Sequence, residues 1–345
     1  MKRFLTLFLL ILLVGCGPAA PDNQPVPFTE DGTVSAIRLD MMPGESNSQR
    51  LEHAIEMARQ AAPTASGRNF YVTASPGRYV FKKPVNFKNV SWESPGGRRS
   101  VVFVFQGVED GTTLVTFAGG HGQTVNGLWV TDAPTGGEFP KDLTAFKFSH
   151  VSSLHATNLD ARLRGDNGTG YLITDEADWR NTESCRFESI SAHCSNPMKF
   201  FSGDNCQFLN IDFTATPKPT KGVWAGIQGG PSTVLSSIRF GGSIQKGNHA
   251  VYFNSEFESG SKGVGDVGIF DGIRWEQGVL DEDNPAAWYL RFRRMKGDRV
   301  VHGQERILMI GCRHGHRAVD VHTEGVLGFE TVGCYLPGQP VPSDP

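Results

Sequence analysis

The sequence predicts an all-β protein: a single-stranded right-handed parallel β-helix with an N-terminal capping helix. Composition gives the first indication, because 41 of the 345 residues are glycine and 23 are phenylalanine. That balance is typical of many tight turns around an apolar, strand-rich core. The second indication is a short motif that recurs at irregular intervals. Together they favour a strand that returns once per coil, with loops of variable length between returns.

The motif is clearest where residues 184–190 (SCRFESI) align with residues 205–211 (NCQFLNI). It consists of an apolar residue, any residue, a small polar residue, a branched apolar anchor, any residue and a second apolar residue. The small polar position is Asn, Gly, Ser or Thr in all windows except one, where Met309 occupies it. The anchors of the nine windows are Val90, Leu128, Leu159, Ile190, Ile211, Ile238, Ile273, Ile310 and Val332. Their uneven spacing argues against a β-propeller or leucine-rich repeats, whose periods are more regular.

In a β-helix, equivalent residues of successive coils stack at the inter-strand spacing of about 4.8 Å. One coil cannot bury its apolar face alone, so its neighbours complete the core. We therefore expect stacked side chains along the axis. The expected stacks are Phe187 on Phe208, Ile190 on Ile211, and Phe213 towards Phe240 and Trp275.

The open N-terminal edge of such a coil needs a cover, because an exposed ladder invites aggregation. Residues 48–62 place Leu51, Ile55, Ala58 and Ala62 at helical spacing. This periodicity predicts an amphipathic helix that covers the edge and ends before Pro63.

The first residues have the pattern of an export signal. Lys2 and Arg3 precede an apolar run over residues 4–14, which is too short for a permanent membrane span and fits the apolar part of a signal peptide. Residues 13–16 (LVGC) resemble a bacterial lipobox, which implies lipidation of Cys16. An ordinary secretory signal with an accidental cysteine is the alternative.

These features predict four segments. Residues 1–15 form the signal peptide, 16–44 the lipidated cysteine with a Pro-rich tether, 45–336 the β-helix, and 337–345 a flexible tail. Lipid chains hold a protein to a membrane without a spanning helix. Gly17 stands where an aspartate would favour inner-membrane retention in lipoproteins, so we expect an exported protein anchored to the outer membrane or cell surface.

Over residues 45–336 the chain resembles the pectate-lyase-like superfamily of parallel β-helix proteins. The resemblance rests on the opening helix, on residues 69–72 (NFYV) and 76–81 (PGRYVF), and on the motifs that continue to Cys334. It implies that a polysaccharide is bound, and it leaves open whether that polysaccharide is cleaved by a lyase or a glycoside hydrolase. Fold alone does not select an activity. The catalytic motifs of polygalacturonases, pectate lyases and alginate epimerases are absent from the sequence.

Side chains alternate along a strand, so residues one and three positions after each anchor are expected to point outward. The first outward column then contains Trp129, Asp160, Asp212, Arg239 and Arg274. The second outward column contains Arg162, His193 and Glu276.

Carboxylates and histidine move protons, and arginine forks hold charged sugar groups. We therefore assign the candidate catalytic roles to Asp212, Glu276, Asp160 and His193. The candidate substrate-binding residues are Arg239, Arg274, Arg162 and Trp129. The alternative is a solvated face whose charges pair across coils, each exposed pair contributing about 0–1 kcal/mol. A non-catalytic scaffold or adhesin, or a trimeric tailspike-like protein, would fit that alternative.

No pattern in the sequence requires a cofactor. Cys312, His314, His316, Asp320 and His322 match no structural zinc spacing. The acidic run at residues 281–284 leaves calcium open without supporting it. Gly263, Gly265 and Gly268 match a dinucleotide fingerprint only as a string, because a strand rather than a helix is expected to follow.

The expected partners are a polysaccharide and, through the lipid anchor, a membrane. Nucleic acid is not expected, because the formal charge is −3 and no basic stretch lies outside the N-terminus. Five cysteines remain after Cys16, of which Cys185 with Cys206, and Cys312 with Cys334, lie near enough in the predicted coils to bridge or to stack as buried thiols. The oligomeric state is left open.

Overall fold

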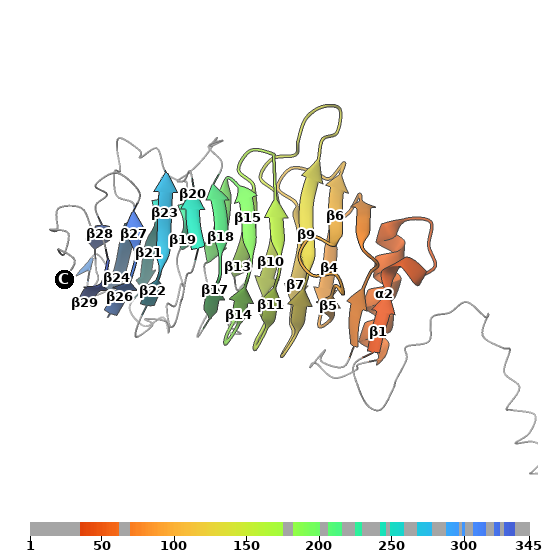
Figure 1. Ribbon diagram of the computed structural model, residues 1–345, viewed down its shortest axis with the longest axis horizontal. Coiled ribbons are helices and arrows are strands. Elements are labelled where there is room, and N and C mark those ends of the chain that lie inside the picture. The colour runs from red at the N-terminus through yellow and green to blue at the C-terminus, as the bar shows by residue number, and fades with distance from the viewer. Residues whose placement is uncertain are drawn as a thin grey trace, which may run out of the picture.

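The computed structural model describes residues 35–61, 70–174, 182–200, 206–215, 225–229, 242–245, 249–258, 268–277, 288–296, 299–300, 306–314, 321–324 and 328–334. Nearly all of the described elements are β-strands, and parallel strands lie side by side in a row from α2 at one end to β28 and β29 at the other (Figure 1). Three sheets run along this row, and a fourth, short sheet lies towards the C-terminal end. The predicted parallel β-helix is confirmed.

The chain enters the sheets in a constant order, which we call A, B and C. Sheet A contains β1 (Ser35–Arg38), β2 (Phe70–Thr73), β5 (Ser91–Glu93), β8 (Thr124–Asn126), β11 (His155–Thr157), β14 (Arg186–Glu188) and β17 (Gln207–Leu209). Sheet B contains β3 (Gly77–Phe81), β6 (Val101–Gln106), β9 (Leu128–Ala133), β12 (Asp160–Arg162), β15 (Ser191–Cys194), β18 (Asp212–Ala215), β20 (Gly242–Gln245), β23 (Ile273–Gln277) and β27 (Arg313–His314).

Sheet C contains β4 (Val85–Lys88), β7 (Thr113–Ala118), β10 (Thr144–Ser149), β13 (Thr169–Thr174), β16 (Asn196–Phe200), β19 (Ala225–Gly229), β21 (His249–Glu258), β24 (Trp288–Lys296) and β28 (Val321–Glu324). The short strand β25 (Arg299–Val300) pairs with β24 in the antiparallel direction. Strands β22 (Gly268–Asp271), β26 (Arg306–Ile310) and β29 (Gly328–Val332) form the fourth sheet and take the place of sheet A in the winding order.

The small polar position of the motif lies at the corner between sheets A and B. Asn158, Ser189 and Asn210 have φ values of 53°, 55° and 53°, in the left-handed region that small polar residues and glycine tolerate best. Their backbone N–H groups continue the ladder: that of Asn158 donates to the carbonyl of Glu188 (3.1 Å), and that of Ser189 to Leu209 (2.9 Å). The composition of this position is therefore a consequence of backbone geometry.

The middle windows are confirmed, and three of the others need correction. The Val90 window lies at the corner from sheet C to sheet A, because Phe87 in β4 pairs with Phe117 of sheet C. In the last two coils the left-handed residues are Gly311 (φ 59°) and Gly333 (φ 62°). The anchors there are two residues later than predicted, which explains why Met309 broke the pattern. The residue before the Ile238 anchor lies outside the described residues.

Aromatic side chains stack inside the coil. Phe187 lies on Phe208 with ring centroids 4.9 Å apart and planes 8° apart, as predicted. A second ladder joins Phe87, Phe117 and Phe148, with centroid distances of 4.8 and 5.6 Å. Such contacts add about 0.5–1.5 kcal/mol per pair beyond the burial of the rings.

The other expected stacks have mixed outcomes. Ile190 and Ile211 are both buried at equivalent corners. Phe213 pairs in register with Ile244, which in turn pairs with Trp275. Phe240 lies outside the described residues, and Ile244 holds the position expected for it.

The predicted capping helix is α2 (Asn47–Ala61), which lies at one end of the row of strands (Figure 1). Leu51, Ala54, Ile55 and Ala58 are buried, and the hydroxyl of Ser46 accepts from the N–H of Gln49 (3.3 Å). The Gln49 side chain accepts in turn from the Ser46 N–H (3.2 Å), which completes a capping box.

Regular structure begins earlier than the expected boundary at residue 45. Strand β1 (Ser35–Arg38) pairs with β2, and the 3-10 helix η1 (Leu39–Met41) follows it. Ile37, Leu39 and Met42 are buried beside α2. Strand β1 is therefore the first strand of sheet A, at the end that α2 covers. Within the described part of the chain, no helix has the length and apolar character needed to cross a membrane.

The left-handed corner at Ser189 generates a test. A β-branched residue at φ 55° is strained, so Ser189→Val should reduce the free energy of unfolding by about 1–2 kcal/mol. Ser189→Gly should leave it within a few tenths, because glycine adopts this conformation freely. Urea unfolding of the two variants measures the difference. Equal midpoints would contradict this account of the corner.

Candidate functional site

The outer face of sheet B carries the two predicted columns over its central coils. The register pairs Trp129 with Asp160, Asp160 with Ser191, and Ser191 with Asp212. Two residues later in each strand, the same pairing joins Thr131, Arg162, His193 and Thr214. The structure therefore places five of the eight predicted site residues in adjacent positions of one sheet.

The C-terminal members of the columns are arranged differently from the prediction. Ser243 is the register partner of Arg274, so the position predicted for Arg239 belongs to β20. Arg239 itself lies outside the described residues. On its other side Arg274 pairs with Arg313. The register shifts next to Glu276, because Gln245 pairs with Gln277. The structure describes Arg274 and Glu276 by their backbone only.

Asp160 is the most buried member of the columns. Its side chain is 2% exposed, and its Oδ2 atom accepts from Nε of Arg99, which comes from the loop between β5 and β6. Nε of Arg162 lies 3.6 Å from the same oxygen. A carboxylate in this position orients two guanidinium groups. The geometry gives Asp160 a positioning role and does not place it where it would contact a substrate.

Trp129 lies between the same two arginines. The guanidinium carbon of Arg162 is 5.1 Å from the centre of the indole ring, and that of Arg99 is 5.9 Å away. Both distances are within the range of cation–π attraction. The indole is half-buried under these side chains. It is therefore part of a charged cluster and not a free stacking platform.

Among the described members of the columns, His193 and Asp212 are exposed. His193 lies one coil from Arg162, and Asp212 lies two coils from Asp160, which corresponds to about 10 Å along the axis. This arrangement leaves both side chains accessible on an outer face.

A neighbouring carboxylate, Asp132, serves the structure of the chain. Its two oxygens accept from the backbone N–H of Arg164 (3.1 and 2.9 Å), and Oδ2 also accepts from Gly165 (3.0 Å). Burial raises the pKa of Asp132, and these N–H donors oppose that shift. The carboxylate fixes the turn that follows β12.

A hollow of about 340 Å³ lies on sheet C, where the sequence analysis placed no site residue. Strands β10, β13 and β16 supply its base through the register-paired series Thr144, Thr169 and Asn196. The preceding turns supply Asp142 and Asn167, whose φ values are 56° and 57°. The full lining is Asp142, Thr144, Asn167, Thr169, Leu172, Asn196 and Lys199.

The polar groups of this hollow are partly connected. The Asn167 amide donates to Oδ1 of Asp142 (3.0 Å), and the Asn196 amide donates to the carbonyl of Asn167 (3.4 Å). Burial lowers the pKa of Lys199, and the negative charge of Asp142 opposes this shift. The hollow thus combines hydroxyl, amide and carboxylate groups with one partly desolvated amine. Such a set can hydrogen-bond a polyhydroxylated ligand and attract an anionic one.

A signal for this site exists in the sequence. Strands β7, β10 and β13 each begin with threonine, at Thr113, Thr144 and Thr169, which pair in register. The recurrent motif spans the corner from sheet A to sheet B, so outward positions counted from it fall on sheet B. Aligning the threonines would have indicated the face of sheet C.

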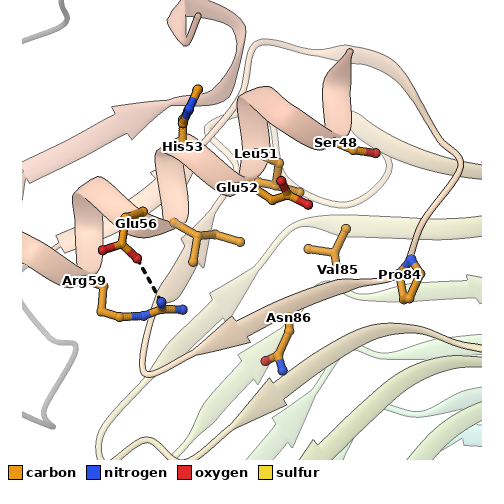
Figure 2. A pocket seen from close by; sticks show the side chains of 10 residues that line it. Ser48, Leu51, Glu52, His53, Glu56, Arg59, Pro84, Val85 and Asn86 are labelled. Atoms are coloured by element: carbon orange, nitrogen blue, oxygen red, sulfur yellow. Dashed lines mark hydrogen bonds and ion pairs between the residues drawn. The ribbon is translucent and has the colours of Figure 1, made fainter. Parts of the chain in front are cut away.

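A second concavity of about 450 Å³ lies between α2 and β4. Figure 2 shows Glu56 and Arg59 joined by an ion pair on the helix, whose atoms are 2.9 Å apart, with Val85 and Asn86 on the neighbouring strand. Leu51 and Ile55 belong to the buried face of α2. This concavity therefore lies where the capping helix packs against the first strand of sheet C.

None of the five cysteines after Cys16 forms a disulfide in the structure. The thiol of Cys185 donates to the carbonyl of Glu183 (3.2 Å), and that of Cys312 to Phe270 (3.5 Å). Burial raises the pKa of Cys194 to about 12. Of the two interpretations left open, unbridged thiols are the one observed, buried in Cys185, Cys206 and Cys312 and partly exposed in Cys334. Among the described residues, no group of His, Cys, Asp and Glu is placed to hold a metal ion; His316 and Asp320 lie outside them.

No family model matches the sequence, and no curated protein matches it. Among solved structures, the A-module of the mannuronan C-5 epimerase AlgE6 of Azotobacter vinelandii is similar, with a TM-score of 0.37 and 11% identity over 88% of this chain and 100% of that chain. The catalytic unit of a GH87 α-1,3-glucanase from Streptomyces thermodiastaticus has a TM-score of 0.32 and 11% identity, over 90% and 70% of the two chains. PfbA, a surface adhesin of Streptococcus pneumoniae, has a TM-score of 0.27 and 11% identity, over 90% and 96%. No residue role is carried over from them.

The burial of Asp160 generates a prediction. Asp160→Asn should reduce the free energy of unfolding by about 1–3 kcal/mol, because it removes the charged acceptor that two guanidinium groups share. Glu188→Gln is the matched control: Glu188 pairs with Arg186 at 2.8 Å on sheet A, and both side chains are more exposed. Its effect should be within about 0–1 kcal/mol. Denaturant unfolding compares them, and a smaller loss for Asp160→Asn than for the control would contradict the positioning role.

Proposed function

We propose that this protein is an exported lipoprotein whose β-helix binds an acidic polysaccharide across sheet C. The observation that carries the proposal is the hollow on β10, β13 and β16, where polar side chains repeat from strand to strand beside Lys199. The sequence resemblance to pectate-lyase-like proteins points to the same class of ligand.

The repetition supports a chain-like ligand. Thr144, Thr169 and Asn196 occupy equivalent positions in three successive strands, about 4.8 Å apart. A polysaccharide presents hydroxyl groups at regular intervals, so several of its units meet equivalent side chains. A small sugar would use only one of these positions.

The charge supports an acidic ligand. Lys199 is the basic residue of the lining, and burial disfavours its ammonium form. Asp142 is engaged by the Asn167 amide. A sugar carboxylate beside Lys199 would supply the negative charge that the ammonium lacks, because an opposite charge within a few ångströms favours the charged form.

Two further parts of the proposal concern chemistry and location. Cleavage would need a proton acceptor. The exposed residues His193 and Asp212 of sheet B are the corresponding candidates on the neighbouring face. Lipid attached to Cys16 would hold the protein at the outer membrane or cell surface, with the residues before β1 as the tether.

Binding tests the assignment to sheet C. Lys199→Met should weaken binding of a uronate-containing polysaccharide about 10- to 100-fold, because it removes a charged hydrogen-bond donor of about 1.5–3 kcal/mol. The control Lys147→Met removes a lysine from the same register series, two strands away and outside the lining of the hollow, and should weaken binding less than Lys199→Met does. Isothermal calorimetry with uronate and neutral polysaccharides measures both. Equal affinities of the two variants would exclude the hollow.

The pH dependence gives the sign of the charge effect. The free protein has a lowered Lys199 pKa, and a bound carboxylate raises it. Affinity should therefore be greatest below the lowered pKa and decrease as the pH rises through it, and Lys199→Met should remove this decrease. New unsaturated or reducing ends in the same mixtures would report cleavage.

The lipid anchor has a separate test. Cys16→Ser should move the protein from the membrane fraction to the soluble exported fraction, because the thiol that carries the lipid is lost. Fractionation of cells that express both forms measures this, with incorporation of labelled palmitate as the second readout. Membrane association that survives Cys16→Ser unchanged would contradict the anchor.

A further inference from the structure

Sheet B carries a cationic cluster that the proposed function does not use. We define the arginine–tryptophan cluster as Arg98, Arg99, Trp129, Asp160 and Arg162. It lies on the outer face of sheet B and the preceding loop, whereas the hollow lies on sheet C. The contacts of the cluster are independent of those that line the hollow.

The loop that carries Arg98 and Arg99 is closed by hydrogen bonds between its own residues. Its two ends meet through the hydroxyls of Ser94 and Ser100, which are 2.6 Å apart, and the Ser100 hydroxyl also contacts the carbonyl of Gly97 (2.9 Å). Gly127 lies against it so closely that a Cβ atom there would be 2.8 Å from that of Ser94. The two arginines thus lie on a loop whose ends are tied together and packed against Gly127.

The backbone of Arg99 is strained. Its φ of 70° is in the left-handed region, which costs a long side chain about 1–2 kcal/mol. Strain of this kind persists where the surrounding contacts hold it, and it concentrates at binding sites. Here it directs Nε of Arg99 towards Asp160.

The cluster has an excess of positive charge. Arg99 and Arg162 share a single carboxylate, Asp160, whose side chain is 2% exposed, and Arg98, the neighbour of Arg99 in the loop, adds a third positive charge. Nε and Nη2 of Arg98 are buried and have no hydrogen-bond partner among the described residues. A partly desolvated cation without a partner is unfavourable, and an anion that supplies acceptors reduces the penalty.

The remaining donors are oriented and accessible. Trp129 holds the guanidinium groups of Arg99 and Arg162 near its ring, at 5.9 and 5.1 Å. The side chains of Arg99 and Arg162 are 45% and 40% exposed, although Asp160 attracts the Nε atom of each. Planar guanidinium groups bind tetrahedral oxyanions through two parallel hydrogen bonds.

We propose that the arginine–tryptophan cluster binds a phosphate group. Its net charge of +2, from three arginines and one aspartate, matches a phosphate that carries about −1.5 to −2 at neutral pH. A single carboxylate would leave positive charge unbalanced. Free phosphate, a phosphorylated sugar and a phospholipid headgroup share this chemistry.

The test measures binding of inorganic phosphate to the full chain by calorimetry. We expect saturable binding that weakens at least tenfold in Arg98→Gln and less in Arg98→Lys, which keeps the charge but loses the fork. Arg186→Gln on sheet A removes the same charge elsewhere and should bind as the unchanged protein does. Circular dichroism verifies that each variant is folded.

Two results would overturn the proposal: no saturable phosphate binding, or equal affinity in Arg98→Gln. If Arg98→Gln does not fold, Trp129→Phe provides the comparison, because the smaller ring attracts the two guanidinium groups less and should also weaken phosphate binding. Further arms distinguish the source among proteins that bind inorganic phosphate. Competition by a sugar phosphate would assign a soluble or glycan phosphate, and retention on phosphatidic acid vesicles but not phosphatidylcholine vesicles would assign a headgroup.

Discussion

The stacking of equivalent residues from coil to coil is the constraint on which the rest of the structure depends. A coil of three short strands has no core of its own, so Phe187 is buried between rings of neighbouring strands, with that of Phe208 in the next coil 4.9 Å away. The register must then be kept at every corner. The left-handed residues between sheets A and B keep it, since their N–H groups bond to the next coil while the chain turns. The stacking of the core and the left-handed conformation of the corners therefore depend on each other.

This mutual dependence explains what could be predicted from the sequence. Residues that repeat once per coil leave a pattern, and the anchors Leu159, Ile190 and Ile211 were placed correctly because the corner that precedes each of them demands a small polar residue. The same rule corrects the last two windows, where Gly311 and Gly333 mark the true corner. The capping helix was found for a similar reason, because Leu51, Ile55 and Ala58 repeat with the period of a helix.

Features that occur once left no pattern and were missed. Strand β1 is only four residues long. Alternation over so few residues does not distinguish a strand from an irregular tether, yet Ile37 is buried. The burial of Asp160 depends on a single loop. The hydrogen bond between the Ser94 and Ser100 hydroxyls closes this loop, and Arg99 of the loop contacts Asp160. Alternation alone placed Asp160 outward but could not show that a loop covers it. The hollow on sheet C was missed because outward positions were counted from a corner on the far side of sheet B.

The same rigidity determines how such a molecule recognises a ligand. Strands paired on both sides cannot open, so side chains on the outer faces are held at fixed multiples of the strand spacing, and selectivity comes from which positions carry charge. The chain as a whole is acidic, with a formal charge of −3, which opposes the approach of any anion. Attraction must then be local: Lys199 on sheet C, and on sheet B the two arginines that share the buried carboxylate of Asp160, with Arg98 beside them in the loop. At physiological salt the screening length is about 8 Å, so the charge of the rest of the molecule is largely screened beyond two strands, whereas these nearby cations are not. An acidic β-helix can in this way bind anionic groups at particular coils without attracting polyanions over its whole surface.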